Sequence, residues 1–314
     1  MKSNYKLYKI AIVIPYYNAS MHIINVVNKI PEYISNIYII DDCSKEVLPS
    51  EVLTKNNKVV ILKNKKNLGV GGAVKKGFLK AMEDKIDFVI KLDADDQMDS
   101  SYIPELLDGI IIKNADYSKG NRFRDLKALK KMPFTRKFGN LGLSFLTKVA
   151  TGYWTNFDPT NGFFAIKREN LEKIDFSNLS DRYFFETSLL SELYFTEAKV
   201  LDISMPAIYE DEKSSMQVWK MPFVFIPRLM KILIKRIIKT YILYDFNIGS
   251  LYLIFGIPMF LFGFFYGIFE WHYHLTNNIL APTGTIMVIT INLILGFQLI
   301  LQAIQYDISR VNKF

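Results

Sequence analysis

The sequence has a single cysteine and none of the residue clusters that bind zinc. Cys43 has no second cysteine to pair with, so an internal disulfide is excluded and a reducing compartment is indicated. There is no CxxC motif and no Cys/His cluster. A GxGxxG fingerprint, an internal repeat and a low-complexity segment are also missing. What is left is a chain of 314 residues, long enough to bury a sizeable core beside a second module.

Charge is absent from two long stretches near the C-terminus. Residues 249–269 are 21 in succession without a charged side chain, and residues 283–304 are another 22. As helices, at about 1.5 Å per residue, each would reach about 30 Å, enough to cross a bilayer. A buried core hairpin is the alternative. Residues 270–282 lack Lys and Arg, whereas basic residues lie outside both stretches, so the positive-inside rule predicts a multi-pass protein with both termini and the soluble part in the cytosol.

Cations concentrate just before the first charge-free stretch. Residues 226–244 carry four of them on one helical face among Leu, Ile and Met, namely Arg228, Lys231, Lys235 and Lys239. Such a helix is predicted to lie among lipid headgroups, and a helix packed on the domain with a solvated face is the alternative. The net charge of +8 is thus attributed to a membrane surface and not to nucleic acid. The predicted division is a cytosolic domain at 1–218, an amphipathic region at 219–248, a transmembrane hairpin at 249–306 and a tail at 307–314.

The soluble part alternates short apolar runs with amphipathic segments. Strands are predicted at 10–14, 37–40, 59–62, 116–119 and 199–203 and in a run beginning at 88. Helices are predicted at 20–29, with Ser20 as N-cap, from 73 onward, and at 102–113, 138–150 and 182–195. This order is typical of a doubly wound α/β fold, in which ligands bind at the carboxyl ends of the strands.

The run that begins at Phe88 ends abruptly in carboxylates. Successive strand side chains alternate, so Asp93 and Asp95 are predicted to face the same way, about 6.5 Å apart. Two hard oxygen ligands at that spacing suit Mg²⁺ or Mn²⁺, which would bridge to a nucleotide diphosphate. A solvated acidic turn after a buried strand is the alternative.

Other polar motifs follow the remaining strands in a fixed order. They are Pro15-Tyr16-Tyr17-Asn18, Asp41-Asp42-Cys43-Ser44, Asn67-x-Gly69-x-Gly71-Gly72-Ala73, Asp93-Ala94-Asp95 and Asp158-x-Thr160-x-Gly162-Phe163. In this order, with a membrane hairpin behind them, the motifs resemble those of family 2 glycosyltransferases of the GT-A fold. Within that family the resemblance is closest to the dolichyl- or polyprenyl-phosphate sugar transferases, which end in an amphipathic interface helix and transmembrane helices. The sequence departs from the family at Ala19 and Asp96, and it lacks the Gln-x-x-Arg-Trp motif of processive synthases.

The resemblance implies a donor site built from the first four strand ends. Tyr17 and either Asp41 or Asp42 would hold the base and ribose, together with Pro15 and Asn18. Asn67, Gly69 and Gly72 would let the backbone approach the nucleotide, although a tight turn with positive φ is an equal explanation for the glycines. Asp93 would contact ribose or metal-bound water, and Asp95 would ligate the Mg²⁺ or Mn²⁺ ion that neutralises the leaving nucleoside diphosphate.

The resemblance also implies an acceptor site. Arg122 and Arg136 match positions that hold the acceptor phosphate, and ordinary surface charge is the alternative for each. Asp158 is the first candidate for a general base, and Glu186 is the second. A lipid phosphate is already anionic near neutral pH, with a second pKa of about 6, and needs no base, whereas a hydroxyl does.

Four functions remain open on these grounds. The first is an inverting transfer of one sugar from a UDP- or GDP-sugar to polyprenyl (undecaprenyl) phosphate at a bacterial inner membrane. The second moves the acceptor to a hydroxyl of a lipid-linked saccharide in cell-surface polysaccharide assembly. The third is a nucleotide-binding scaffold without turnover, and the fourth is a dinucleotide oxidoreductase built on the glycines. Gly263 and Gly267 form a GxxxG motif that makes a homo-oligomer possible.

Overall fold

The computed structural model describes residues 4–124, 134–206 and 221–311. The chain divides into two compact units, Met1–Ile232 and Leu233–Phe314. The boundary lies inside the region predicted to be amphipathic.

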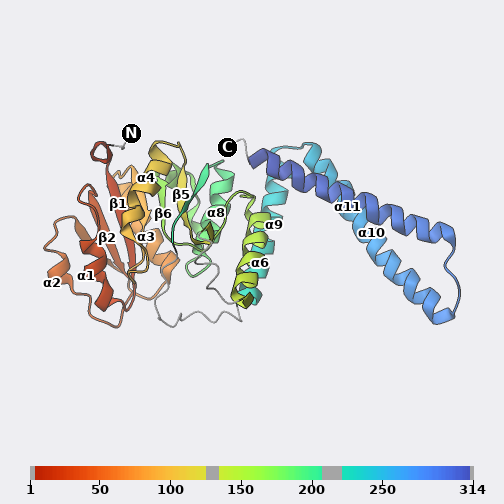
Figure 1. Ribbon diagram of the computed structural model, residues 1–314, viewed down its shortest axis with the longest axis horizontal. Coiled ribbons are helices and arrows are strands. Elements are labelled where there is room, and N and C mark those ends of the chain that lie inside the picture. The colour runs from red at the N-terminus through yellow and green to blue at the C-terminus, as the bar shows by residue number, and fades with distance from the viewer. Residues whose placement is uncertain (1–3, 125–133, 207–220, 312–314) are drawn as a thin grey trace. The chain divides into compact units, whose positions relative to one another are not determined.

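The first unit is built around a seven-stranded sheet in the order β3-β2-β1-β4-β6-β5-β7 (Figure 1). The strands are β1 (Ile10–Tyr16), β2 (Asn36–Asp41), β3 (Val59–Lys63), β4 (Phe88–Lys91), β5 (Tyr117–Asn121), β6 (Phe164–Lys167) and β7 (Val200–Ser204). All neighbours pair in parallel except β6, which runs antiparallel to both β4 and β5. The predicted α/β fold is confirmed, with the refinement that the sheet is mixed.

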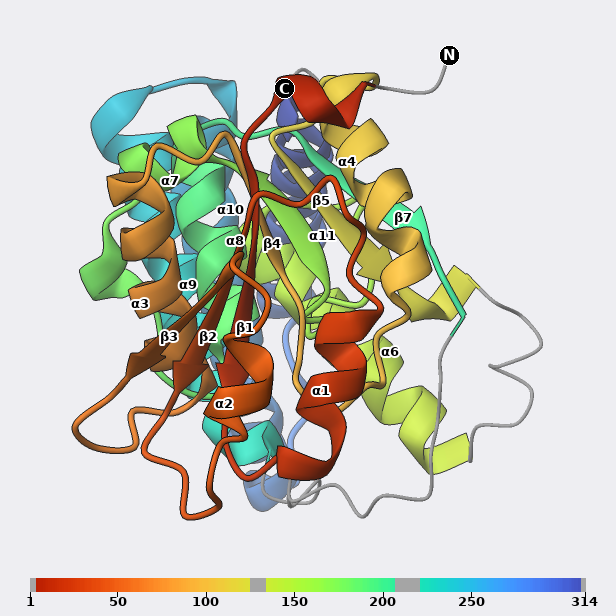
Figure 2. The ribbon, with the colours of Figure 1, turned by 90° about the vertical axis from the view of Figure 1, so that its left-hand side faces the viewer.

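Helices cover both faces of this sheet, as a doubly wound fold requires (Figure 2). The helices that lie wholly within this unit are α1 (Ser20–Asn28), α2 (Ser50–Leu53), α3 (Val70–Glu83), α4 (Ile103–Ile111), α6 (Phe134–Thr151), α7 (Arg168–Lys173) and α8 (Phe185–Phe195), and α9 (Met221–Ile237) crosses the boundary between the two units. Helix α3 packs against β1 and β2, and α4 packs on the other face against β5 and β6. Residues Ile10 to Ile14 are fully buried, as expected for a strand covered on both faces.

Several predicted boundaries are wrong by one or a few residues. Ser20 is the first residue of α1 and not its cap, because its hydroxyl donates to Glu46 Oε2 at 2.7 Å while Ala19 takes the cap position. Helix α8 begins at Phe185 rather than at Arg182. The predicted basic loop at 127–137 is helical from Phe134 onward, and its first part lies outside the described residues.

Helix α9 has an apolar face as well as a basic one. Ile226, Met230 and Ile234 are each 45% to 52% exposed and lie four residues apart. Arg228 is not directed only to solvent, since its guanidinium lies 5.6 Å from the centre of the Phe184 ring. The sequence thus forms the predicted helix, with exposed apolar and cationic side chains together on its surface.

The second unit is a helical hairpin. A π-helical segment (Ile238–Tyr244) precedes α10 (Ile248–Asn277) and α11 (Thr283–Val311). Only 22% of the most apolar stretch of α10 and 6% of that of α11 is buried, so these helices are not the core of a folded domain. Helix α10 continues eight residues beyond the predicted span and so includes His272 and His274. The alternative of a buried core hairpin is therefore wrong.

Glycines let the two long helices approach closely. A Cβ at Gly256 would lie 2.8 Å from Leu299 Cβ, and one at Gly263 would lie 2.9 Å from the Leu293 nitrogen. Gly267 faces Ile289 in the same way. The predicted glycine face is therefore used inside the hairpin, and self-association stays a prediction.

Buried charges stabilise this unit at the end where α11 finishes. Asp307 Oδ1 accepts hydrogen bonds of 2.6 Å from both Arg236 Nη1 and the Tyr241 hydroxyl. Both charged side chains are about 95% buried, so each supplies the countercharge that the other needs.

Candidate active site

A cleft lies beyond the end of β4, and the predicted metal ligands line it. Its empty volume, including the part open to solvent, is about 620 Å³. The lining residues include Asp93, Asp95, Gln97, Asp99, Arg122, Thr160, Asn161 and Gly162. The strand ends at Lys91, earlier than predicted, yet Leu92 and Ala94 are buried while Asp93 and Asp95 reach the cleft. The two carboxylates therefore share one cavity, as the alternation predicted.

The environment of Asp95 favours a bound cation. Burial raises the pKa of Asp95, and the neighbouring charge of Asp93 raises it further. The repulsion within such a pair is relieved when a divalent ion enters. Among the residues that the structure describes, no group of three or more Asp, Glu, His or Cys side chains could hold a metal by itself. Two carboxylates still fit Mg²⁺, which is commonly bound by one or two carboxylates with substrate phosphates supplying further ligands.

A buried lysine stands behind Asp93. Lys91 Nζ lies 2.7 Å from Asp93 Oδ1 and 3.4 Å from Glu186 Oε1, and its side chain is 2% exposed. Burial disfavours the charge on Lys91, but the two carboxylates outweigh this effect and raise its pKa. Burial raises the pKa of Glu186, with Lys91 opposing that effect. Glu186 thus contacts the ammonium group of Lys91 and does not itself line the cleft.

The loops after β1 and β2 are tied to each other by Asn18. Its Oδ1 accepts hydrogen bonds from Ser44 Oγ at 2.9 Å and from the Lys45 nitrogen at 3.0 Å. Asp41 Oδ1 accepts from the Ser44 nitrogen at 2.8 Å. Tyr17 is 46% exposed beside this turn. Asn18 therefore builds the edge on which Tyr17 and Asp41 are presented.

Asp42 holds the glycine loop in place. Its carboxylate accepts from the Leu68 nitrogen at 2.9 Å, the Gly69 nitrogen at 2.7 Å and Asn64 Nδ2 at 2.7 Å. With three donors on its carboxylate, Asp42 holds the loop, whereas Asp41, which is also buried, has the Ser44 nitrogen and, at 3.7 Å, Lys63 Nζ as partners. Asn64 is a residue that sequence reasoning missed, whereas the predicted Asn67 is exposed.

The glycines of this loop are explained by close packing. Gly69 has φ +91°, and a Cβ there would lie 2.6 Å from the Asp181 carbonyl oxygen. The Gly72 nitrogen donates to that same carbonyl at 3.0 Å. The alternative of a turn with positive φ holds for Gly69, and the role of these residues beside a nucleotide stays a prediction.

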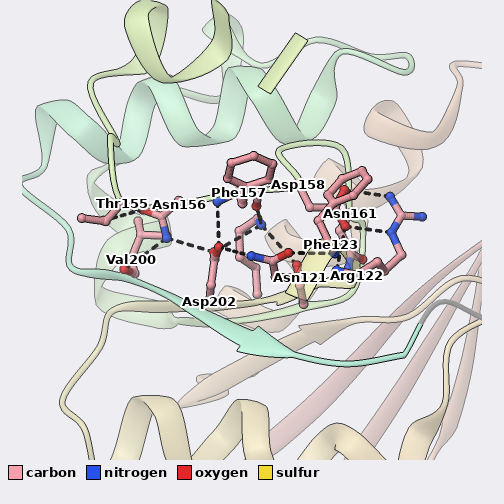
Figure 3. Close-up of polar contacts among 12 residues, drawn as sticks. Asn121, Arg122, Phe123, Thr155, Asn156, Phe157, Asp158, Asn161, Val200 and Asp202 are labelled. Atoms are coloured by element: carbon pink, nitrogen blue, oxygen red, sulfur yellow. Dashed lines mark hydrogen bonds and ion pairs between the residues drawn. The ribbon is translucent and has the colours of Figure 1, made fainter. Parts of the chain in front are cut away.

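On the acceptor side, the buried Asp158 forms an ion pair with the partly exposed Arg122 (Figure 3). Asp158 Oδ2 accepts from Arg122 Nε at 2.8 Å and from the Arg122 nitrogen at 3.1 Å, while Oδ1 accepts from Nη2 at 2.8 Å. Burial works to raise the pKa of Asp158, but the hydrogen bonds and charge of Arg122 outweigh it and lower the pKa below 3.8. Asp158 is fully buried and has φ +54°. Both carboxylate oxygens of Asp158 are therefore engaged by Arg122, and the role of Asp158 as a base stays a prediction.

A second polar cluster holds the turn that carries Asp158 (Figure 3). Asp202, on β7, accepts from Asn121 Nδ2 at 2.8 Å, Asn156 Nδ2 at 2.9 Å and the Phe157 nitrogen at 2.7 Å. Lys119 Nζ lies 3.4 Å from Asp202 Oδ1. Sequence reasoning missed this cluster, although a charged residue inside an apolar strand such as Val200–Ser204 is a usable signal for a buried pair.

Arg136 lies in the first turn of α6, beside the part of the chain outside the described residues. Arg136 is predicted to lie in the basic loop, and it is helical instead because the helix begins four residues earlier than expected. Its predicted contact with an acceptor phosphate stays a prediction.

Solved structures define the class of fold. The glucosyl-3-phosphoglycerate synthase of Mycobacterium tuberculosis, in a complex with Mn²⁺, UDP and glucosyl-3-phosphoglycerate, aligns with a TM-score of 0.54. The alignment covers 72% of this chain and 80% of that one at 15% identity. At that identity the likeness concerns the fold alone, which is the GT-A fold of nucleotide-sugar transferases.

Sequence comparisons define the family. Residues 11–175 match the family Glycosyl transferase family 2, so the chain belongs to that family and is a glycosyltransferase. A UDP-N-acetylglucosamine--dolichyl-phosphate N-acetylglucosaminyltransferase of Methanococcus voltae is 35% identical over 55% of this chain and 75% of its own length. A dolichol-phosphate mannosyltransferase of Pyrococcus furiosus is 27% identical over 57% of this chain and 51% of its own length.

Family membership decides between several of the open functions. The expectation of a family 2 glycosyltransferase is confirmed, and it replaces the oxidoreductase and the scaffold without turnover. Both relatives are archaeal, so they lend no support to the expected bacterial inner membrane. Two apolar C-terminal helices are present, as predicted for a membrane anchor.

Proposed function

We propose that this protein transfers one sugar from a nucleoside diphosphate sugar to a polyprenyl or dolichyl phosphate at a membrane surface. The phosphate oxygen of the lipid attacks the anomeric carbon, the bond from that carbon to the diphosphate breaks, and the configuration inverts. The relative from Methanococcus voltae makes UDP-N-acetylglucosamine the first donor to test.

The observation that carries the proposal is the pairing of Asp158 with Arg122. Both carboxylate oxygens of Asp158 are bound to Arg122, and its lowered pKa makes it a poor acceptor for a hydroxyl proton. The buried carboxylates of Glu186 and Asp202 also bind cations or amides. A lipid monophosphate, with a second pKa of about 6, arrives already ionised and needs none of them.

We propose that Arg122 receives that phosphate. Its side chain is 38% exposed and lines the cleft that Asp93 and Asp95 also line. The buried carboxylate of Asp158 fixes the direction of the Arg122 guanidinium, and a guanidinium of fixed direction suits an oxyanion. We assign Arg136, on the first turn of α6, as its partner in holding the lipid phosphate.

Asp93 and Asp95 would hold a Mg²⁺ or Mn²⁺ ion against the donor diphosphate. The ion supplies charge neutralisation of the leaving group. The fit rests on two carboxylates in one cleft and on the raised pKa of Asp95, which reflects burial and the repulsion that a cation would relieve. Tyr17 and Asp41 would face the base and ribose, and Asn18 and Asp42 would hold the loops that present them.

Membrane attachment would bring the lipid to this cleft. The apolar and cationic surface of α9 is suited to the headgroup layer, and α10 and α11 are long and apolar enough to cross a bilayer. We propose that the segments 1–218, 219–248, 249–306 and 307–314 act as catalytic domain, interface region, hairpin and cytosolic tail.

A screen of donors and acceptors with the full-length protein in lipid nanodiscs tests the proposal. UDP- and GDP-sugars are each combined with dolichyl phosphate, undecaprenyl phosphate or a lipid-linked oligosaccharide, with Mn²⁺ present. We expect release of nucleoside diphosphate with a polyprenyl or dolichyl phosphate. Release only with the oligosaccharide would favour the hydroxyl acceptor and overturn the proposal.

A further inference from the structure

Lys91 is a deeply buried charged group behind the cleft. It is the last residue of β4, its side chain is 2% exposed, and it lies 2.7 Å from Asp93 and 3.4 Å from Glu186. Burying an ammonium group is costly unless carboxylates compensate it. The ammonium group of Lys91 is therefore stabilised by the carboxylates of Asp93 and Glu186, and it neutralises their charges in turn.

Gly162 leaves space for the ammonium group of Lys91. A Cβ at Gly162 would overlap with Lys91 Nζ and would lie 3.1 Å from Glu186 Oε1 and 3.3 Å from Asp93 Oδ2. Gly162 also lines the cleft, so the lysine lies directly beneath the wall that a donor would touch. The glycine is required here for the space that it leaves, since the structure gives it no positive φ.

The cluster joins the two sides of the site. Asp93 follows β4, on the donor side, whereas Glu186 is in the first turn of α8 and Gly162 precedes β6. The ammonium group of Lys91 contacts both carboxylates and so bridges Asp93 and Glu186. The position of the Asp93 carboxylate thus depends on a residue of α8 through one ammonium group.

We propose that Lys91 is a positioning residue that holds the Asp93 carboxylate for the donor, and that Glu186 fixes Lys91 instead of acting as a base. The inference rests on the proposed function, in which Asp93 contacts the metal-bound donor. Lys91 thereby affects the Kd for the nucleotide and its metal, and Glu186 affects the same Kd through Lys91.

The test measures binding and does not depend on turnover. Full-length protein is titrated calorimetrically with UDP and with GDP, each with Mn²⁺, and the nucleotide that the wild type binds is used for the variants. Lys91→Met removes the ammonium group, and Glu186→Gln removes the charge that fixes it. We expect the Kd for the nucleotide to rise about 10-fold to 100-fold in Lys91→Met and less in Glu186→Gln, because a charge-assisted hydrogen bond to Asp93 is lost or loosened.

The double variant Lys91→Met/Glu186→Gln separates positioning from folding. It leaves no unpaired Glu186 charge, so it should fold even where Lys91→Met does not. Weak nucleotide binding in the folded double variant supports the inference, and binding restored to the wild-type Kd overturns it. Lys167→Met is the control, since Lys167 is also paired with an aspartate, Asp116 at 2.9 Å, but does not line the cleft, and we expect it to leave the nucleotide Kd unchanged.

Two further outcomes have distinct meanings. If the wild type binds neither UDP nor GDP, the proposed function fails and the inference fails with it. If the wild type binds and Glu186→Gln lowers kcat without changing the Kd, Glu186 does not act through donor binding and the inference is overturned, while the proposed function is judged separately by the acceptor screen.

Discussion

The donor side and the acceptor side of the cleft are built in different ways. On the donor side, polar residues follow consecutive strands, and their contacts are mostly between neighbouring loops, such as Asn18 with Ser44 and Asp42 with Gly69. On the acceptor side, the decisive contacts join distant elements, such as Arg122 with Asp158 and Lys119 with Asp202. The donor side can therefore be recognised from sequence motifs, whereas the acceptor side depends on pairs of residues that the sequence alone does not reveal.

The largest expected effect comes from removing a donor-side carboxylate. Asp95→Ala should abolish measurable transfer, a loss of at least about 1000-fold, because the diphosphate loses its metal. Steady-state assays in nanodiscs measure the loss, and circular dichroism checks the fold. Residual activity within about tenfold of the wild type would contradict the metal assignment.

Next in size is the loss of an acceptor-side cation. Arg136→Ala should raise the KM for the lipid phosphate about 10-fold to 100-fold and leave the donor KM unchanged, because only the acceptor phosphate loses a charge-assisted contact. Arg168→Ala, on α7, is the matched control. An equal rise in both KM values would count against a phosphate clamp at this position.

A smaller effect is expected from the support beneath Arg122. Asp158→Asn should raise the acceptor KM about tenfold and lower the free energy of unfolding by about 2 kcal/mol at pH 7. The folded-state pKa of Asp158 is lowered, so its stabilising contribution is present above the unfolded value near 3.8 and is lost as the pH falls through the lowered value. Thermal unfolding of variant and wild type at several pH values measures this difference in the free energy of unfolding. A difference between variant and wild type that grows as the pH falls below about 4 would contradict the ion pair.

The smallest effect should come from the residue beside Asp95. Asp96 has φ +61° and binds Asn25 and the half-exposed Lys29. Asp96→Gly removes an exposed ion pair but suits the backbone, so the free energy of unfolding should change by less than about 1 kcal/mol and transfer should persist. Denaturant unfolding and the transfer assay measure the two quantities. A loss comparable to that of Asp95→Ala would show that the acidic loop depends on more than its metal ligands.

The sequence predicted the fold and the donor motifs because both depend on local patterns. Apolar runs located the strands, and the turn formers after them located the loops. The order of the motifs identified the family, although the antiparallel β6 was not foreseen, because strand direction is not encoded in a strand's own residues.

The rest of the site depends on contacts between residues far apart in the chain. Asp158 is predicted as a base from its turn alone, whereas in the structure both of its oxygens accept hydrogen bonds from Arg122, 36 residues away. Glu186 is separated from Lys91 by 95 residues. The one local signal for that pair was a lysine inside the apolar run that begins at Phe88, since a buried lysine requires a partner.

The dependence of kcat on pH tests most directly whether the acceptor supplies its own nucleophile. It is measured with a prenyl phosphate and with a phosphonate analogue whose second pKa differs from about 6. We expect the acidic limb of the profile to move with the pKa of the acceptor and to remain in Asp158→Asn. A limb that stays in place when the acceptor changes and disappears in Asp158→Asn or Glu186→Gln would show that the protein supplies a base and would contradict the account.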